Sequence, residues 1–188
     1  MKHSEESNVI AGHALENEQN LRLATKVGLA FPTVKERIIT EFLRSLSKSL
    51  ESRLGNNWSV QNKWAEAPLK SGGYISAFKH VWPVSASIGM AFYKSGPSNL
   101  YFFVYLGVKL DSPLVAELRE GLEAGYAHGY QNADSVWWTR VEERHRDWDT
   151  EDALVGLWHK DKALEYYASH IIKLCNIAEP FLDKICSE

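Results

Sequence analysis

The segment 84–106 reads VSASIGMAFYKSGPSNLYFFVYL and contains two apolar runs joined by a turn. Every second position of the first run is apolar, which is typical of a strand with one buried face. The alternating residues are Val84, Ala86, Ile88, Met90 and Phe92. The second run, at 100–110, is rich in aromatic and β-branched residues, which favour strands. A Gly-Pro-Ser-Asn turn at 96–99 separates the two runs. We therefore predict a central hairpin of strands at 84–94 and 100–109.

Further strands are predicted on both sides of this hairpin. Trp58, Val60 and Trp64 alternate with polar residues, a similar pattern runs through 74–82, and 135–141 has the composition of a last strand. The connections between the first four strands are short, which requires antiparallel pairing because parallel pairing needs a long crossover.

Helical periodicity surrounds the strands. A helix is predicted at 33–54, with Thr33 and Glu36 as a capping box and Gly55 as its stop. Its apolar stripe consists of Val34, Ile38, Phe42, Leu46 and Leu50. A second helix is predicted to begin at Pro113 with Ser112 as its cap. Helices at 151–159 and 161–177 follow.

A short final helix is predicted after Pro180, which should separate it from the helix at 161–177. The fold class expected is α+β, an antiparallel sheet of about four to five strands packed against amphipathic helices. Residues 1–30 are predicted to be a flexible N-terminal arm that docks on the domain or on a second copy. Residues 31–188 are predicted to form a single domain.

Composition narrows the class of protein. The chain has 188 residues and a net charge of −3, without the concentrated basic run that tight binding to a phosphate backbone needs. Nucleic acid is therefore not the expected partner. No apolar run approaches the length of a membrane span, and the polar N-terminus does not resemble a signal peptide. We expect a cytoplasmic protein with no membrane partner, and we expect Cys175 and Cys186 to be reduced.

From about residue 55 onward, the aromatic spacing resembles the C-terminal, non-catalytic region of bacterial PD-(D/E)XK-superfamily nuclease-like proteins. The residues that carry the resemblance are Trp58, Trp64, Gly73-Tyr74-Ile75, Lys79-His80-Val81-Trp82, Trp137-Trp138 and Asp147-Trp148. The acidic pair and Glu-x-Lys of that superfamily are missing, and Glu117-Leu118-Arg119 is the nearest analogue, within a predicted helix. The resemblance implies an accessory protein of a bacterial or phage defence-type system without nuclease chemistry.

His80 is the strongest catalytic candidate. On an alternating strand it would share a face with Tyr74, Phe78 and Trp82, while Lys79 would point the other way. Aromatic walls could adjust its pKa for general-base catalysis. A half-buried structural histidine explains the pattern better, because no nucleophile or carboxylate lies at a telling spacing. We therefore assign no catalytic residue.

The segment 142–152 and three nearby tryptophans are the strongest binding candidates. The acidic residues of segment 142–152 could form a docking edge for a basic partner, or they could form ion pairs with the neighbouring arginines. A third possibility is a metal site formed by His145, Asp147 and Asp149. Neighbouring tryptophans on a strand point to opposite faces, so one of Trp137 and Trp138 should be outward or lie under a helix. The candidate binding residues are Trp137, Trp138, Asp147, Trp148, Asp149 and Asp152.

These patterns favour a non-enzymatic protein that binds a macromolecule through an aromatic and acidic surface. An immunity protein, an inhibitor or an accessory subunit fits, with a protein as the partner; a second copy of the chain is also a candidate. We expect no bound metal, and we expect no cofactor because the sequence contains no cofactor-binding motif. The alternative is a nucleic-acid-processing or hydrolytic enzyme module with a site around His80.

Overall fold

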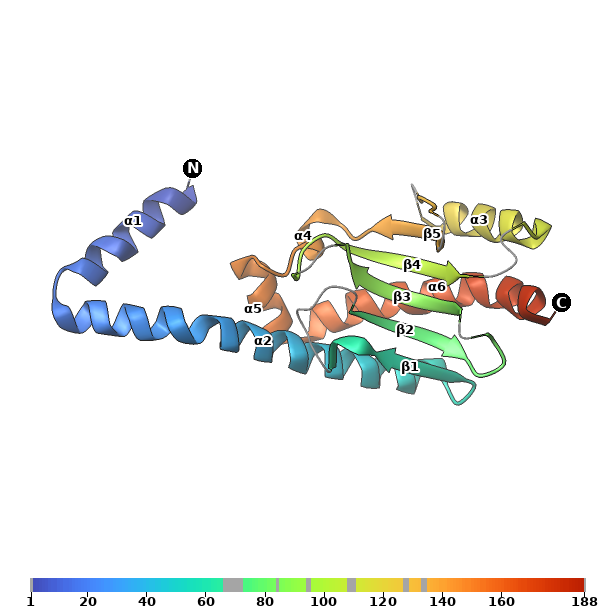
Figure 1. Ribbon diagram of the computed structural model, residues 1–188, viewed down its shortest axis with the longest axis horizontal. Coiled ribbons are helices and arrows are strands. Elements are labelled where there is room, and N and C mark those ends of the chain that lie inside the picture. Colours follow the sequence, from blue (N-terminus) through green and yellow to red (C-terminus); the bar gives the residue numbers. More distant parts are fainter. Residues whose placement is uncertain are drawn as a thin grey trace. The chain divides into compact units, whose positions relative to one another are not determined.

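The computed structural model describes residues 2–65, 73–83, 85–93, 96–107, 111–126, 129–132 and 135–187. The chain divides into two compact units, Met1–Arg37 and Ile38–Glu188, each of which is considered by itself. The first contains helix α1 (Lys2–Leu15) and the beginning of helix α2 (Glu18–Leu54). The second contains the rest of α2, all five strands and the remaining helices (Figure 1).

The fold is α+β, and its sheet is a five-stranded antiparallel meander. The strands are β1 (Trp58–Asn62), β2 (Tyr74–Lys79), β3 (Ala86–Phe92), β4 (Leu100–Leu106) and β5 (Ser135–Arg140), and their spatial order follows the chain. The predicted central hairpin is confirmed: Ala86 lies opposite Leu106, and Phe92 opposite Leu100. Val84, which was expected in this hairpin, lies outside the described residues. Trp64 belongs to a short 3-10 helix, Lys63–Ala65, and not to β1.

Helix α6 (Asp161–Ser187) and the C-terminal part of α2 cover one face of the sheet (Figure 1). Helices α3 (Pro113–Gly125), α4 (Glu143–Arg146) and α5 (Glu151–His159) complete the second unit. The predicted core is confirmed for Phe42, Leu46, Ile88 and Phe92, which are all buried in one cluster.

Two helices are longer than the sequence indicated. Helix α2 begins at Glu18, because the side chain of Asn17 accepts a hydrogen bond from the Asn20 amide, and it continues through Pro32 and Thr33. The predicted capping box at Thr33 is therefore wrong. The predicted break at Pro180 is also wrong, because α6 runs through it. Burial of α6 side chains on both sides of this proline outweighs the cost of a missing backbone hydrogen bond.

The other helix ends agree with the sequence, with two qualifications. Helix α2 ends at Leu54 and Gly55 adopts a φ of 81°, as a glycine stop requires. Helix α3 begins at Pro113, but the Ser112 side chain makes no capping hydrogen bond. Gly125 at the end of α3 allows close packing on α6, because a Cβ there would lie 2.7 Å from Ile177 Cδ1.

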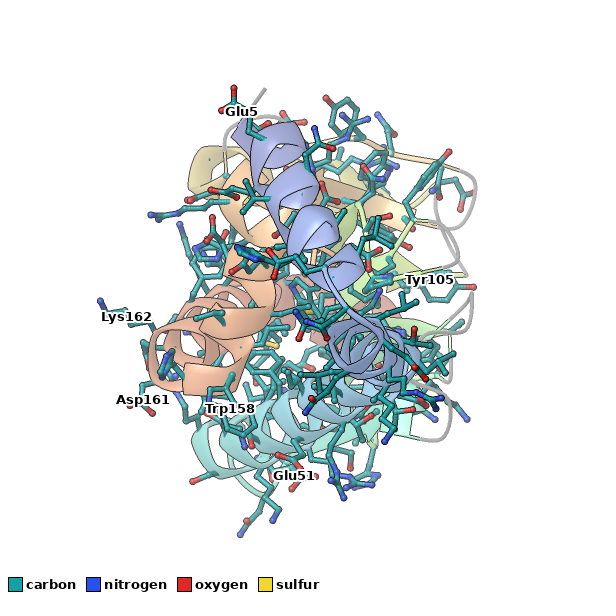
Figure 2. All side chains as sticks on the ribbon, turned by 90° about the vertical axis from the view of Figure 1, so that its left-hand side faces the viewer. Glu5, Glu51, Tyr105, Trp158, Asp161 and Lys162 are labelled. Carbon is teal, nitrogen blue, oxygen red and sulfur yellow. The ribbon has the colours of Figure 1, made fainter. Side chains whose placement is uncertain are left out.

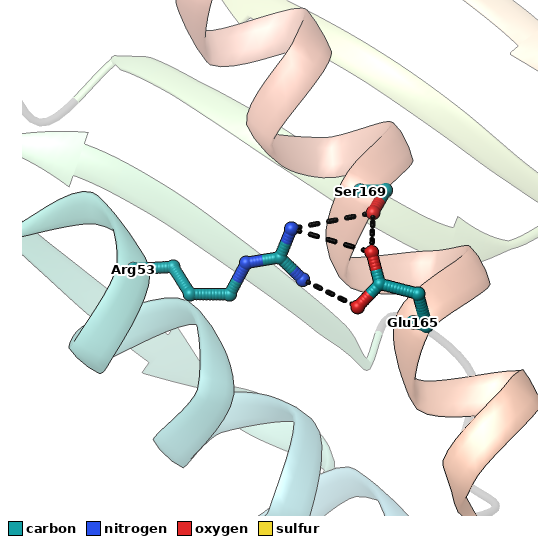
Figure 3. A network of polar contacts seen from close by, with 3 residues as sticks. All are labelled: Arg53, Glu165 and Ser169. Carbon is teal, nitrogen blue, oxygen red and sulfur yellow. Dashed lines mark hydrogen bonds and ion pairs between the residues drawn. The ribbon is translucent and has the colours of Figure 1, made fainter.

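Polar contacts at the surface connect α2 to α6 within the second unit. Figure 3 shows Arg53 of α2 reaching both Glu165 and Ser169 of α6. The Arg53 Nη1 atom lies 3.1 Å from Glu165 Oε2, and Nη2 lies 3.3 Å from Ser169 Oγ. The Ser169 hydroxyl also donates to Glu165, and this bond together with the arginine charge lowers the pKa of the Glu165 carboxyl. These exposed contacts orient the helices but contribute little to stability.

A more buried ion cluster fixes the end of β2 to α6. The Lys79 ammonium lies 2.6 Å from carboxylate oxygens of both Glu179 and Asp183, and its side chain is only 12% exposed. The indole of Trp82 donates to the other oxygen of Asp183 over 2.7 Å. Burial opposes the charge on Lys79, but the hydrogen bonds and charges of the two acids outweigh it and raise the lysine pKa. Lys79 and Trp82 thus lie together, contrary to the strand alternation expected, because β2 ends at Lys79 and a turn follows.

Candidate binding face of the sheet

The sheet face opposite α2 and α6 is aromatic on one side and built from small residues in the middle. Alternation along the strands directs every second side chain to this face, and the strand register aligns them in rows. No helix in the described residues of the second unit covers it (Figure 1). The side chains on this face are Tyr74, Ser76 and Phe78 of β2, Ser87, Gly89 and Ala91 of β3, Tyr101, Phe103 and Tyr105 of β4, and Trp138 and Arg140 of β5.

A hollow of about 460 Å³ lies over the small residues. Ser87 and Ala91 of β3 contribute to its floor, while aromatic rings from β2 and β4 form its walls. Gly89 is required beside it, because a Cβ there would lie 2.0 Å from the carbonyl oxygen of Ile75 on β2. The described lining residues are Gly73, Tyr74, Ser87, Ala91, Phe92, Tyr101, Phe103, Tyr105, Asn132 and Ser135.

A second hollow of about 140 Å³ shares Tyr101 with the first. Tyr93, Asn99, Trp138 and Arg140 complete its described lining. The Trp138 ring packs edge-on against Tyr101, with ring centres 5.8 Å apart. Together the two hollows offer flat rings at the edges of a shallow depression.

The chemistry of the larger hollow is polar but uncharged. Its ten described lining residues include no acid, base or thiol, and their polar groups are hydroxyls and one amide. Burial raises the pKa of Tyr101, so its hydroxyl stays protonated and can donate a hydrogen bond at neutral pH. The only charged side chain lining either hollow, among the described residues, is Arg140 in the smaller one. Such a surface fits an apolar or aromatic group better than an ion.

The three candidate tryptophans have different environments. Trp137 and Trp148 are fully buried, so neither can be an outward anchor. The Trp148 indole donates to the Tyr167 hydroxyl over 2.7 Å and packs against Phe42 with ring centres 5.4 Å apart. Trp138 alone lies on the candidate face, where it stacks on Tyr130 at 4.6 Å and is not covered by α6. Of the three tryptophans predicted as anchors, only Trp138 is therefore accessible to a partner.

The acidic segment 142–152 is folded and is not extended. It contains the single helical turn α4, so the alternation that would align His145 with two aspartates does not apply. Asp147 accepts a hydrogen bond from the Asn99 amide over 2.6 Å, which holds the segment beside the smaller hollow. Asp152 lies in the first turn of α5, where a carboxylate favours the helix dipole, and both it and Asp149 are exposed.

His80 has an unexpected neighbour. It follows β2 in an exposed turn, and its Nε2 atom lies 2.9 Å from the Ser59 hydroxyl of β1. A hydroxyl beside an imidazole is the first requirement of serine-type nucleophilic catalysis. Within the described ranges, no carboxylate contacts the other ring nitrogen, and neither side chain lines the two hollows described above.

Sequence reasoning did not identify the rings that line the hollow. The signal was available in β4, where Tyr101, Phe103 and Tyr105 alternate with purely apolar residues. The aromatic side of this strand was not recognised as separate from the core. Ser59 could not be found in the same way, because it pairs with His80 across two strands.

The described residues contain no group of three or more metal-binding side chains. None of the helices in the described ranges is both long and apolar enough to cross a membrane. No protein-family model matches the chain, and neither the curated proteins nor the solved structures include a match.

Proposed function

We propose that the protein is a non-enzymatic binding protein that recognises a protein partner through the sheet face opposite α2 and α6. The observation that carries this proposal is the uncharged aromatic hollow of about 460 Å³ on a face that no described helix of the second unit covers. An aromatic or aliphatic side chain of the partner would enter the hollow between the rings of β2 and β4. Tyrosine, tryptophan and arginine are the residues that dominate binding energy at protein interfaces, and all three occur here.

The acidic segment 142–152 adds a charge that would act on the encounter with the partner. Asp149 and Asp152 are exposed, and Asp147 places the segment beside the smaller hollow. Exposed charges at the edge of an interface mainly increase the association rate, and salt screens this effect over about 8 Å at physiological ionic strength. A partner with a basic rim around an apolar anchor fits this arrangement. The resemblance to nuclease-like proteins adds the proposal that the partner belongs to a defence-type system, as an immunity protein, inhibitor or accessory subunit would require.

The test compares two tryptophans in affinity capture from cells that produce the protein. Trp138 lies on the candidate face, whereas Trp158 of α5 is exposed at the surface (Figure 2). We expect the parent and Trp158→Ala to retain the same partner, and Trp138→Ala and Tyr101→Ala to lose it. With the purified partner, Trp138→Ala should raise Kd by about 30-fold or more, as loss of an anchor does. Equal capture and equal Kd for the parent, the Trp138 variant and the Tyr101 variant would refute the proposal.

A second candidate function, hydrolysis by a serine nucleophile, is favoured by the 2.9 Å contact between Ser59 and His80. In this function His80 would accept the proton of the Ser59 hydroxyl as that oxygen attacks a carbonyl or phosphoryl centre, and would pass it to the leaving group as the bond to that group breaks; water would then hydrolyse the ester formed on Ser59. A fluorophosphonate probe labels an activated serine covalently. Labelling of the parent that is absent from Ser59→Ala and from His80→Gln would support hydrolysis. The binding proposal expects no labelling in any of the three.

A further inference from the structure

The unit Met1–Arg37 exposes far more apolar surface than the rest of the protein. It contains nine of the fourteen large hydrophobic side chains that are exposed among the described residues, each between 47% and 77% exposed. They are Val9, Ile10, Leu15, Leu21, Leu23, Val27, Leu29, Phe31 and Val34. Exposed apolar patches of more than a few hundred Å² on a soluble protein mark interaction surfaces.

Four of the apolar positions of α2 line up along one side. Leu23, Val27, Ala30 and Val34 are separated by four, three and four residues, which brings them onto one narrow stripe of a helix. Leu29 lies on the other side of the same helix. The segment that carries the stripe is helical in the structure. Its large apolar side chains are nevertheless not covered by other described residues of the same chain.

This part of α2 does not gain its stability from helix propensity. Pro32 removes one backbone hydrogen bond, the one to the carbonyl of Gly28, and Gly28 itself disfavours a helix interior. A Cβ at Gly28 would meet nothing within 4 Å, so packing within the chain does not explain the glycine. In proteins most of the stability of a helix comes from packing of its apolar face and not from propensity. A contact with another chain would supply the missing stabilisation.

The charges of the unit indicate what that chain is. Residues 1–17, which include α1, contain three acids and one lysine, a net charge of −2, whereas residues 18–37 contain four basic residues and two acids, a net charge of +2. The two halves therefore complement each other, and the unit as a whole is neutral. A second copy offers the same pair of halves, so reciprocal contact under twofold symmetry satisfies both at once.

We propose that the protein forms a dimer in which α1 of each copy packs on the first part of α2, residues 18–37, of the other copy. The acidic segment 1–17 of one copy then lies against the basic segment 18–37 of the other, and the α2 stripe is covered by the apolar residues of α1. The 14 residues of α1 extend about 21 Å at 1.5 Å per residue, which is shorter than the segment that receives it.

The available area is sufficient for such a dimer. At roughly 100 Å² of apolar surface per large side chain, with about 60% of it exposed, the eight side chains other than Leu29 offer on the order of 500 Å² per copy. Both copies together then bury about 1,000 Å², which is the lower limit for a specific interface. The dimer is therefore expected to be of modest affinity and to depend on its charges.

The first test measures mass by sedimentation of the full chain. We expect twice the 21.3 kDa monomer mass at about 100 µM, and weaker association at higher salt because the opposite charges are screened. Val27→Ser should weaken the dimer about tenfold or more, while Leu29→Ser on the other side of α2 should leave it unchanged. A parent that stays monomeric, or equal effects of the two serine variants, would overturn the proposal.

The second test exchanges the charges of the two halves. One variant carries Glu5→Lys, Glu16→Lys and Glu18→Lys, which makes both halves positive; the other carries Arg22→Glu, Lys26→Glu and Arg37→Glu, which makes both negative. Each variant alone should be monomeric, and an equimolar mixture should regain the dimer.

The charge exchange separates pairing between copies from pairing within one copy. If α1 instead paired with α2 of its own chain, or if a different protein or a lipid surface covered the stripe, the mixture would remain monomeric and the proposal would fail. The charge changes also remove the 2.8 Å hydrogen bond from Arg22 Nε to Glu18. The helical content of each variant is therefore measured by circular dichroism to confirm that it is folded.

Discussion

Trp148 should be essential for the stability of the fold and should make no contact with a binding partner. Its ring is fully buried and packs against rings from three elements: Phe42 of α2, Phe92 of β3 and Tyr167 of α6, with ring centres 5.4, 5.2 and 5.5 Å away. Replacing a buried tryptophan by alanine costs about 3–5 kcal/mol, and the cost is higher where the surroundings cannot collapse into the cavity. Because three separate elements hold this site open, we expect Trp148→Ala to cost about 4–5 kcal/mol.

Urea unfolding followed by far-UV circular dichroism measures this cost. With a slope of about 2 kcal/mol per molar urea, the midpoint should fall by about 2 M. The midpoint of Trp148→Phe, which keeps a ring, should fall less, so this variant provides the measurement if the alanine variant does not fold. The matched control is Trp158→Ala, because Trp158 is 62% exposed and should change stability by no more than about 0.5 kcal/mol. A Trp148→Ala protein that is as stable as the parent would refute the packing argument.

Three further outcomes follow from buried groups of the second unit. Phe42→Ala should lower the unfolding free energy by about 3–5 kcal/mol in the same assay, since its ring is fully buried; an unchanged midpoint would contradict this. Lys79→Met should cost about 1–3 kcal/mol, because its two carboxylate partners lose their counter-charge but keep more than a third of their surface in water. Adding Asp183→Asn, which removes one of these charges but keeps an acceptor for the Trp82 indole, should recover part of the loss. Burial lowers the pKa of both His145 and His170 below 6.5. The stability that these histidines contribute should therefore be fully present above about pH 6.5 and should fall as the pH drops toward their folded-state pKa values. Thermal melting from pH 8 to 5 should show this loss, and replacing both histidines by glutamine should make the melting temperature less dependent on pH.

The sheet was predictable because its signals are local. The alternation in β3, the turn at 96–99 and the aromatic run of β4 lie within one short segment, and neighbouring strands pair with each other. Helix α2 shows the opposite case: Thr33 and Glu36 form a good local cap, but the chain before them continues the same helix back to the cap at Asn17. A local motif can mark where a helix would start without showing that it starts there.

The candidate binding face was less accessible from the sequence. The sequence identified Trp138 as a candidate anchor, but it could not show that Trp148 is buried and Trp138 is not. The burial of Trp148 depends on rings from α2, β3 and α6. Likewise, the ion cluster around Lys79 joins residues 104 positions apart, a distance at which no spacing rule applies. Which side of β4 is covered is decided by where α6 packs, and the strand alone does not contain that information.

The position of α6 after all five strands also affects how the protein is made. All five strands leave the ribosome before the helix that covers them, and β4 is complete at residue 106 while α6 extends from Asp161 to Ser187. At about 5–20 residues per second, the apolar side of β4 waits about 4–16 s for its cover. During that interval Phe102 and Val104, which are buried in the finished protein, are available to other nascent chains and to chaperones. A ribosome that stalls before α6 is synthesised would therefore release a preformed sheet with an uncovered, aggregation-prone face.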